Sequence, residues 1–179
     1  MKNFIIIAML SVYAIGFSQE KMITKAGKIS FEASVPSFEE VKATNTNVTF
    51  VLNPETGEIA SLALMRGFHF KVALMEEHFN ENYMESDRYP KAIFKGKIEN
   101  FDLKSVTDSP KDYIIKGKLE LHGKAQDIMT TARIKMSASG ISIVSNFAVN
   151  ASDFNIAIPS LVKSKVSNKI NIQITTVLK

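Results

Sequence analysis

Acid–base or metal chemistry in this sequence would have to come from its three histidines and its carboxylates. No two histidines stand at the spacing of a metal-binding pair such as HxxxH, and none neighbours an acidic pair in a known ligand pattern. His69 lies in an apolar stretch, His78 stands beside Phe79, and His122 precedes Gly123. We interpret them as a strand, a helix and a turn residue, and we predict no metal site.

Nucleophilic and phosphate-binding motifs are missing from the sequence as well. The chain has no Cys, which excludes a thiolate nucleophile, a zinc–thiolate site and a disulfide framework. It contains no GxSxG, GxGxxG or GxxxxGK[ST] motif. Glu39-Glu40 and Glu76-Glu77 are adjacent pairs whose side chains would diverge on a helix, and Asp153 has no second carboxylate close by. We therefore expect no catalytic residue and no cofactor, with an enzyme for a hydrophobic substrate kept as an alternative.

The elements that would position these side chains are mostly strands, because apolar and polar residues alternate through most of the chain. Turn-forming residues at 53–57, 122–124 and 137–140 separate neighbouring strands. Short strands joined by such turns favour an antiparallel sandwich or barrel, and the last strand could pair with the first to close it. The strands are predicted within residues 29–35, 48–52, 59–72, 93–103, 113–121, 128–136, 141–149 and 170–176, and residues 155–158 are strand-like.

One segment departs from this alternation and is typical of a helix. Val72, Met75, Phe79 and Tyr83 recur at offsets of three and four residues, which places them on one helix face. Pro90 ends the segment, because the residue before a proline favours an extended backbone. We expect this helix to lie across one end of a closed β structure and to plug it.

The N-terminal residues and the charge distribution indicate the compartment and disfavour some partners. Lys2 precedes an apolar segment too short to span a bilayer, and small residues suited to cleavage follow at 16–18. Residues 1–18 are therefore predicted to be a signal peptide and residues 19–179 a mature periplasmic or secreted domain without an integral membrane span. The net charge is +4, but no two Lys or Arg residues are adjacent, which argues against nucleic acid as a partner.

Several stretches resemble the YceI family of exported, lipocalin-like proteins. Tyr89-Pro90 followed by Phe94 looks like that family's KYPxxxF element, with Arg88 in place of Lys. Residues 117–123 resemble its GxLxxHG hairpin, residues 147–154 its FxxxxxDF-type element and residues 158–174 its closing segment. These stretches stand in family order and span nearly the whole mature chain. Residues 38–50 depart from the family, because they lack the histidine- and glycine-bearing stretch of many members.

The resemblance implies an all-β fold: an extended antiparallel eight-stranded lipocalin-like barrel with a short helix at one end. It also implies a long hydrophobic tunnel that binds an amphiphilic lipid with a polyisoprenoid or quinone-type tail. We therefore expect a binding protein that sequesters or transports such a lipid in the cell envelope. It implies no catalytic residue. The helix would then shape the mouth of the tunnel.

Candidate ligand-binding residues are large apolar residues on the strands and the helix. Alternation groups the residues of one face without telling which face points inward. The candidates are Phe31, Phe50, Leu62, Leu64, Phe79, Tyr83, Phe94, Ile115, Phe147 and Ile172. Arg66, Lys163 and Lys165 are candidates for contact with an anionic head group.

Other interpretations of the same pattern stay open. A barrel of eight strands can be packed solid or can enclose one small ligand, so a structural envelope stress protein with a filled barrel is an alternative. An outer-membrane barrel would carry two aromatic girdles, whereas this chain has no Trp and only four Tyr. A homodimer also stays open. The expected partner is an isoprenoid or another long-chain lipid.

Overall fold

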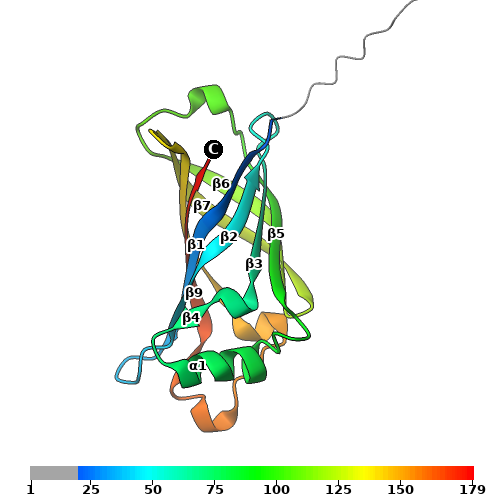
Figure 1. The fold of residues 1–179 in the computed structure, drawn as a ribbon, viewed down its shortest axis with the longest axis vertical. Coiled ribbons are helices and arrows are strands. Elements are labelled where there is room, and N and C mark those ends of the chain that lie inside the picture. Colours follow the sequence, from blue (N-terminus) through cyan, green and yellow to red (C-terminus); the bar gives the residue numbers. More distant parts are fainter. Residues whose placement is uncertain (1–19) are drawn as a thin grey trace, which may run out of the picture.

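The protein is a closed antiparallel barrel of eight strands with one short α-helix at one end, as Figure 1 shows. The computed structural model describes residues 20–179, and the predicted signal peptide at 1–18 lies outside these residues. The barrel strands are β1 (Met22–Ser34), β2 (Lys42–Leu52), β3 (Glu58–Leu64), β5 (Lys91–Ile98), β6 (Lys111–Leu121), β7 (Lys124–Ser137), β8 (Gly140–Asn150) and β9 (Val166–Leu178). The predicted fold class is confirmed.

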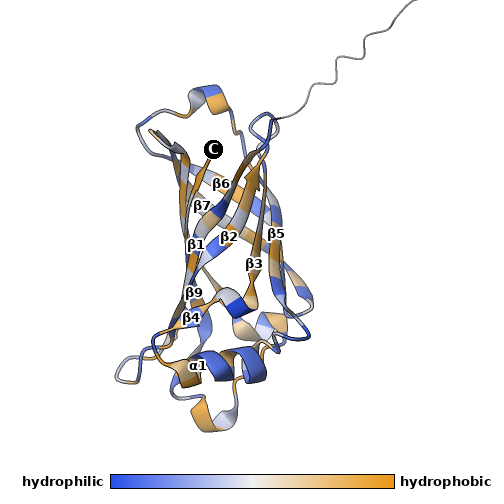
Figure 2. Ribbon diagram, in the orientation of Figure 1, coloured by the Kyte–Doolittle hydropathy of each residue, from blue (hydrophilic) through white to orange (hydrophobic). Residues whose placement is uncertain are grey.

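Strand β1 closes the barrel because it pairs on both of its edges. Phe31 stands opposite Ala43 of β2 on one side and opposite Ile172 of β9 on the other. The last strand therefore pairs with the first, as the sequence predicts. Side chains alternate between the two faces of each strand, so closure sends every second residue into the barrel. Figure 2 shows the resulting mixture of hydrophobic and hydrophilic positions along the strands.

Two predicted strands are too long, and the strand-like segment at 155–158 is not a strand. The predicted strand at 59–72 ends at Leu64, and the 3-10 helix η1 (Met65–Gly67) separates it from the short strand β4 (His69–Phe70), which pairs with β2. The buried Asn45 of β2 donates from its side-chain amide to the Leu64 carbonyl (3.0 Å). A side chain of the neighbouring strand β2 thus binds the β3 backbone where the ladder between the two strands would have continued.

The other two corrections concern segments where the backbone turns at an asparagine with positive φ. The predicted strand at 93–103 ends at Ile98, because Asn100 has φ = 51° and Leu103 begins the 3-10 helix η3 (Leu103–Ser105). Residues 155–158 form no strand. Asn155 has φ = 57° and follows the 3-10 helix η4 (Ala151–Phe154), and the segment then continues to the 3-10 helix η5 (Ser160–Val162).

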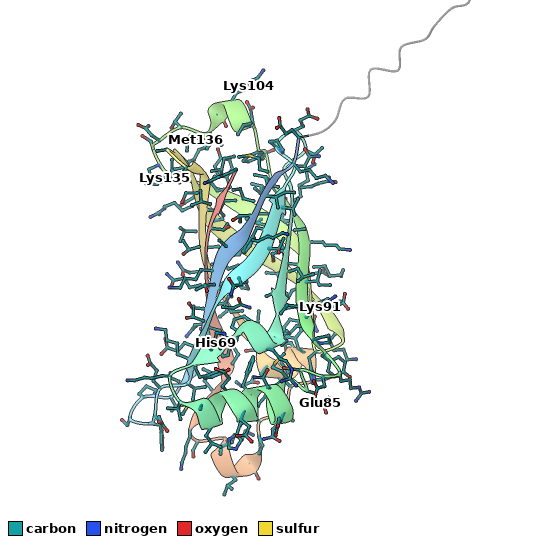
Figure 3. The ribbon with its side chains drawn as sticks, viewed as in Figure 1. His69, Glu85, Lys91, Lys104, Lys135 and Met136 are labelled. Carbon is teal, nitrogen blue, oxygen red and sulfur yellow. The ribbon has the colours of Figure 1, made fainter. Side chains whose placement is uncertain are left out.

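The upper half of the barrel, as drawn in Figure 1, holds a core of buried apolar side chains. Leu52, Ile98, Ile134, Ile141 and Leu178 point into it and are fully buried. The loop after β5 covers this end. Its Phe101, Leu103 and Val106 pack against the core, and Figure 3 places Lys104 of that loop at the same end as Lys135 and Met136.

The lower end is covered by the predicted helical insert. It consists of α1 (Ala73–His78) followed by a π-helical turn, η2 (Phe79–Tyr83), and it lies across the barrel end in Figure 1. Asn80 donates to the Glu76 carbonyl (2.9 Å) and accepts from the buried Ser86 hydroxyl (2.8 Å). These bonds fix the turn that leads from the insert toward β5.

We predict that the packed half supplies most of the stability. Ile98→Ala should lower the free energy of unfolding by about 2–5 kcal/mol, because it leaves a cavity in a core that cannot collapse fully. Ile114→Ala on the adjacent strand β6 is the matched control: Ile114 is 44% exposed, so its loss should be about 1 kcal/mol or less. Urea denaturation measures both. Equal losses would contradict a packed upper half.

Candidate functional site

The lower half of the barrel contains a cavity of about 400 Å³. This volume lies in the range of roughly 300–1,000 Å³ that is usual for small-molecule sites. Its wall is built from inward positions of all eight barrel strands and is overwhelmingly apolar. The polar residues of the wall are few: Glu39, Ser61, His78, Tyr83, Thr130, Ser145 and Lys165.

The cavity reaches the surface at the lower end of the barrel, at what we call the mouth. The mouth lies between residues 35–41, the helical insert and residues 155–166. Exposed residues from each of these segments, namely Phe38, His78 and Lys165, belong to the cavity lining. Figure 1 shows the three segments at the same end.

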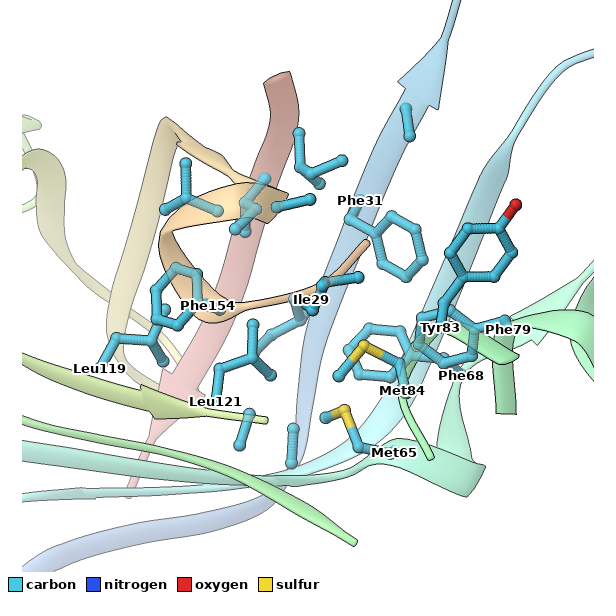
Figure 4. Close-up of a pocket in the computed structure, with 18 of the residues that line it drawn as sticks. Ile29, Phe31, Met65, Phe68, Phe79, Tyr83, Met84, Leu119, Leu121 and Phe154 are labelled. Carbon is cyan, nitrogen blue, oxygen red and sulfur yellow. The ribbon is translucent and has the colours of Figure 1, made fainter. Parts of the chain in front are cut away.

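A cluster of phenylalanines attaches the insert to the barrel wall. Phe31 of β1 stacks on Phe79 of the insert with ring centroids 5.3 Å apart. Phe68 and Phe70, which flank His69, contact both rings at centroid distances between 5.2 and 6.0 Å. Figure 4 shows Phe31, Phe68 and Phe79 side by side beside Tyr83. Such pairs contribute about 0.5–1.5 kcal/mol each beyond their buried area.

Polar contacts hold the outer side of the same insert. The Glu76 carboxylate accepts a hydrogen bond from the Phe70 backbone N–H (3.0 Å) and lies 3.2 Å from His69 Nδ1. The helix is thereby tied to β4 from outside, while the phenylalanine cluster ties it from inside. His69 is thus an exposed residue that helps position the insert and does not line the cavity.

Three of the recognised sequence stretches meet at His122. Its ring lies 4.4 Å from the Tyr89 ring, and its Nδ1 donates to the Phe154 carbonyl (3.1 Å). Its Nε2 lies 3.5 Å from a Glu85 carboxylate oxygen. Gly123 has φ = 72°, and a Cβ there would lie 2.7 Å from the Tyr89 ring. The hairpin turn therefore fastens the end of the insert to η4.

Two glycines make room for one wall residue. Gly96 of β5 and Gly117 of β6 stand opposite each other in the ladder. A Cβ on either would lie 2.6 Å from Cζ of Phe94, which lines the cavity. The Phe94 ring therefore lies flat against the wall over these glycines and leaves the space beyond it free.

The structure brings most of the predicted lining residues together. Phe31, Phe50, Phe79, Tyr83, Phe94, Ile115, Phe147 and Ile172 all line the cavity. Leu62 and Leu64 do not, because Ser61 and Ala63 are the inward residues of β3, and Leu64 is 50% exposed. The prediction that these two leucines line the cavity is therefore wrong. Residues of β3 do alternate between its two faces, but the face with Leu62 and Leu64 points away from the cavity.

The three predicted head-group residues separate in the structure. Lys165 lines the cavity at the mouth. Arg66 and Lys163 lie outside the lining, and Arg66 forms an exposed ion pair with Asp87. The outer face of β7 carries a further ion pair, in which a hydrogen bond from Arg133 to Asp112 (3.0 Å) raises the pKa of the guanidinium.

Sequence reasoning missed several residues of the wall. Ile29, Ala33, Ile170 and Ile174 follow from the same alternation, because they flank Phe31 and Ile172 at intervals of two residues. Residues from loops and turns carry no such periodic signal. They include Met65, Phe68, Met84, Phe154, Ile156, Ile158 and Val162, and Figure 4 shows Met65, Met84 and Phe154 around the cavity.

Catalytic and metal-binding groupings are scarce in this site. Among residues 20–179, no three His, Cys, Asp or Glu side chains gather where they could hold a metal ion. His78 is the one histidine of the described chain that lines the cavity. No helix within the same residues is both long and apolar enough to cross a membrane.

Comparison with known proteins identifies the family. The model of the YceI-like domain matches residues 15–178. The chain belongs to the YceI-like family. The YceI resemblance of the sequence is thereby confirmed, and it covers the strands that build the cavity as well as the insert.

Solved structures share the YceI-like fold at low sequence identity. A polyisoprenoid binding domain from Saccharophagus degradans, implicated in plant cell wall breakdown, is 14% identical with a TM-score of 0.75, covering 89% of this chain and 97% of that one. BcnA of Burkholderia cenocepacia is 15% identical with a TM-score of 0.68, covering 83% and 94%. The Campylobacter jejuni YceI protein is 18% identical with a TM-score of 0.60, covering 100% and 99%. A search of curated protein sequences gives no significant match.

We predict that the phenylalanine cluster holds the insert in place. Phe79→Ala should raise amide hydrogen exchange across residues 73–83 by roughly tenfold, because losing about 1.4 kcal/mol of local stability has that effect. Leu74→Ala in the same insert is the control, since Leu74 is 57% exposed and its exchange should stay near wild type. If both variants exchange alike, the cluster does not anchor the insert.

Proposed function

We propose that this protein binds one long-chain amphiphilic lipid, with a polyisoprenoid or quinone-type tail, and sequesters or carries it within the cell envelope. The apolar cavity that opens at the mouth carries this proposal. Binding is non-covalent and non-enzymatic: the tail fills the cavity, and the polar end stays in contact with water or polar groups. The cavity argues against the alternative of a filled barrel.

The free energy of burial is sufficient for such a role. Each buried methylene contributes about 0.8 kcal/mol, so roughly ten of them contribute about 8 kcal/mol. Lost translational freedom and chain ordering oppose this gain. A short chain would thus bind weakly, and useful affinity requires a tail that fills most of the cavity. This favours long or branched hydrocarbon chains over small apolar molecules.

Family membership and a structural neighbour support the same ligand class. The Saccharophagus degradans protein, which has the same fold, is described as a polyisoprenoid binding domain. The predicted signal peptide at residues 1–18 supports a place in the periplasm or outside the cell. In an aqueous compartment, a lipid with such a tail needs a carrier to stay dispersed.

The surface around the mouth fits exchange of an apolar ligand. Phe38, Leu74 and Leu161 come from the three segments that form the mouth, and they are 47%, 57% and 87% exposed. Exposed apolar side chains of this kind often mark contact with another apolar surface. We infer that the lipid enters and leaves at this end of the barrel.

Lipid recovered from the native host tests the proposal. Protein purified from that host should yield a long-chain lipid on organic extraction and mass spectrometry. Ile172→Trp should carry far less, because displacing two or three methylenes weakens binding roughly 15- to 60-fold. Asn171→Trp places the same side chain on the exposed face of β9 and should behave as wild type. Lipid-free protein that also refuses added prenyl chains would overturn the proposal.

The histidines separate a binding protein from an enzyme. His78→Ala should leave lipid affinity within a few-fold of wild type. His122→Ala should have the same small effect, measured on the fraction of the protein that remains folded. Both variants are assayed by native mass spectrometry with an added prenyl lipid. A product that forms from a prenyl or acyl ester with wild type, and not with His78→Ala, would favour an enzyme instead.

A further inference from the structure

The barrel wall is interrupted between β7 and β8. These strands pair from Ser137 and Gly140 down to Ala132 and Ser145, where their ladder ends. Below that point, residues 124–131 continue to pair with β6 and residues 146–150 with β9. Figure 1 shows the β6–β7 hairpin on one side of the lower end and β9 on the other, with η4 between them.

Side chains define the two ends of this β7–β8 gap. At its upper end the hydroxyls of Thr130 and Ser145 lie 3.0 Å apart, and Ser145 donates to the Thr131 carbonyl (2.9 Å). At its lower end the Gln126 side chain donates to the Asp153 carbonyl of η4 (2.7 Å). Side-chain hydrogen bonds therefore mark both ends of the gap.

The gap contains a notch of about 310 Å³ that borders directly on the cavity. Ile128, Phe147, Val149 and Phe154 line both the notch and the cavity. One layer of apolar side chains therefore separates the ligand site from the outer notch. Rotation of these side chains would connect the two without breaking a strand ladder, since the ladder is already interrupted there.

The notch is polar and lacks an excess of positive charge. Its charged residues are Asp127, Asp153 and Lys169. Lys118 pairs with Asp127 (2.8 Å), and Asn150 donates to the Asp153 carboxylate (3.1 Å). Because Lys118 and Lys169 balance the two carboxylates, the notch offers no net positive charge to a phosphate or carboxylate head group, whereas the carboxylates accept hydrogen bonds from a hydroxyl. The chemistry of the notch therefore favours a neutral, hydroxyl-type polar group.

We propose that the β7–β8 gap is a side opening that holds the polar end of the bound lipid, and that this end is a neutral hydroxyl-type group. This inference rests on the proposed lipid-binding function. A polar group left without a partner in the apolar cavity would cost free energy. The Thr130 and Ser145 hydroxyls, the Asp153 carboxylate and backbone groups outside the β7–β8 ladder can supply hydrogen bonds. The competing position is the mouth, where Lys165 would favour an anionic group.

Two lipids with the same tail and different polar ends test the inference. We would measure the affinities of geranylgeraniol and geranylgeranyl monophosphate by native mass spectrometry. The quantity compared is the ratio of the two affinities in each variant relative to wild type, which cancels the different solubilities of the lipids. The variants are Asp127→Asn/Asp153→Asn at the side opening and Lys165→Gln at the mouth. All three residues are exposed, so the fold should be kept.

The side opening predicts a shift in one variant only. Asp127→Asn/Asp153→Asn should move the ratio toward the phosphate on the order of fivefold, because the loss of two negative charges leaves Lys118 and Lys169 unbalanced at the opening. Lys165→Gln should leave the ratio unchanged. A ratio that responds to Lys165→Gln and not to the aspartate changes would overturn the side opening while leaving lipid binding intact. If neither lipid binds wild type, the proposed function itself fails.

Discussion

Closure of the strand ring is the constraint on which the rest of this structure depends. Because β1 pairs with both β2 and β9, alternation along every strand is converted into an inside and an outside. An open sheet with the same residues would expose two unpaired edges and one apolar face to water. The ring needs no covalent cross-link, which suits a chain without cysteine.

The closed ring is not uniform along its axis. In the upper half, inward side chains such as Leu52, Ile134 and Leu178 are fully buried in the apolar core. In the lower half the inward residues leave a cavity, and the phenylalanine cluster with the helical insert covers it instead. Leaving space unfilled forfeits packing energy, and the solid half offsets that loss.

Much of this arrangement could be predicted from the sequence, because alternation and turn residues are local signals. They give most strand positions, the helical insert and the pairing of the last strand with the first. Relations between distant residues were out of reach. Asn45 interrupts the strand at Met65 through a bond to Leu64, and the inward face of β3 carries the small Ser61 and Ala63 instead of the leucines. The β7–β8 gap could not be predicted either, because the alternation of residues continues in both strands beyond the point where their pairing ends.

The separation of a solid half from a hollow half has a consequence for how such a chain diverges. Substitutions around the hollow change which guest fits, and their effect on the solid half should be small when the sites are far apart and share no partner. Selection can therefore reshape the hollow half without passing through a sequence that no longer folds. Such tolerance to substitution would explain why proteins only 14–18% identical to this chain share its fold.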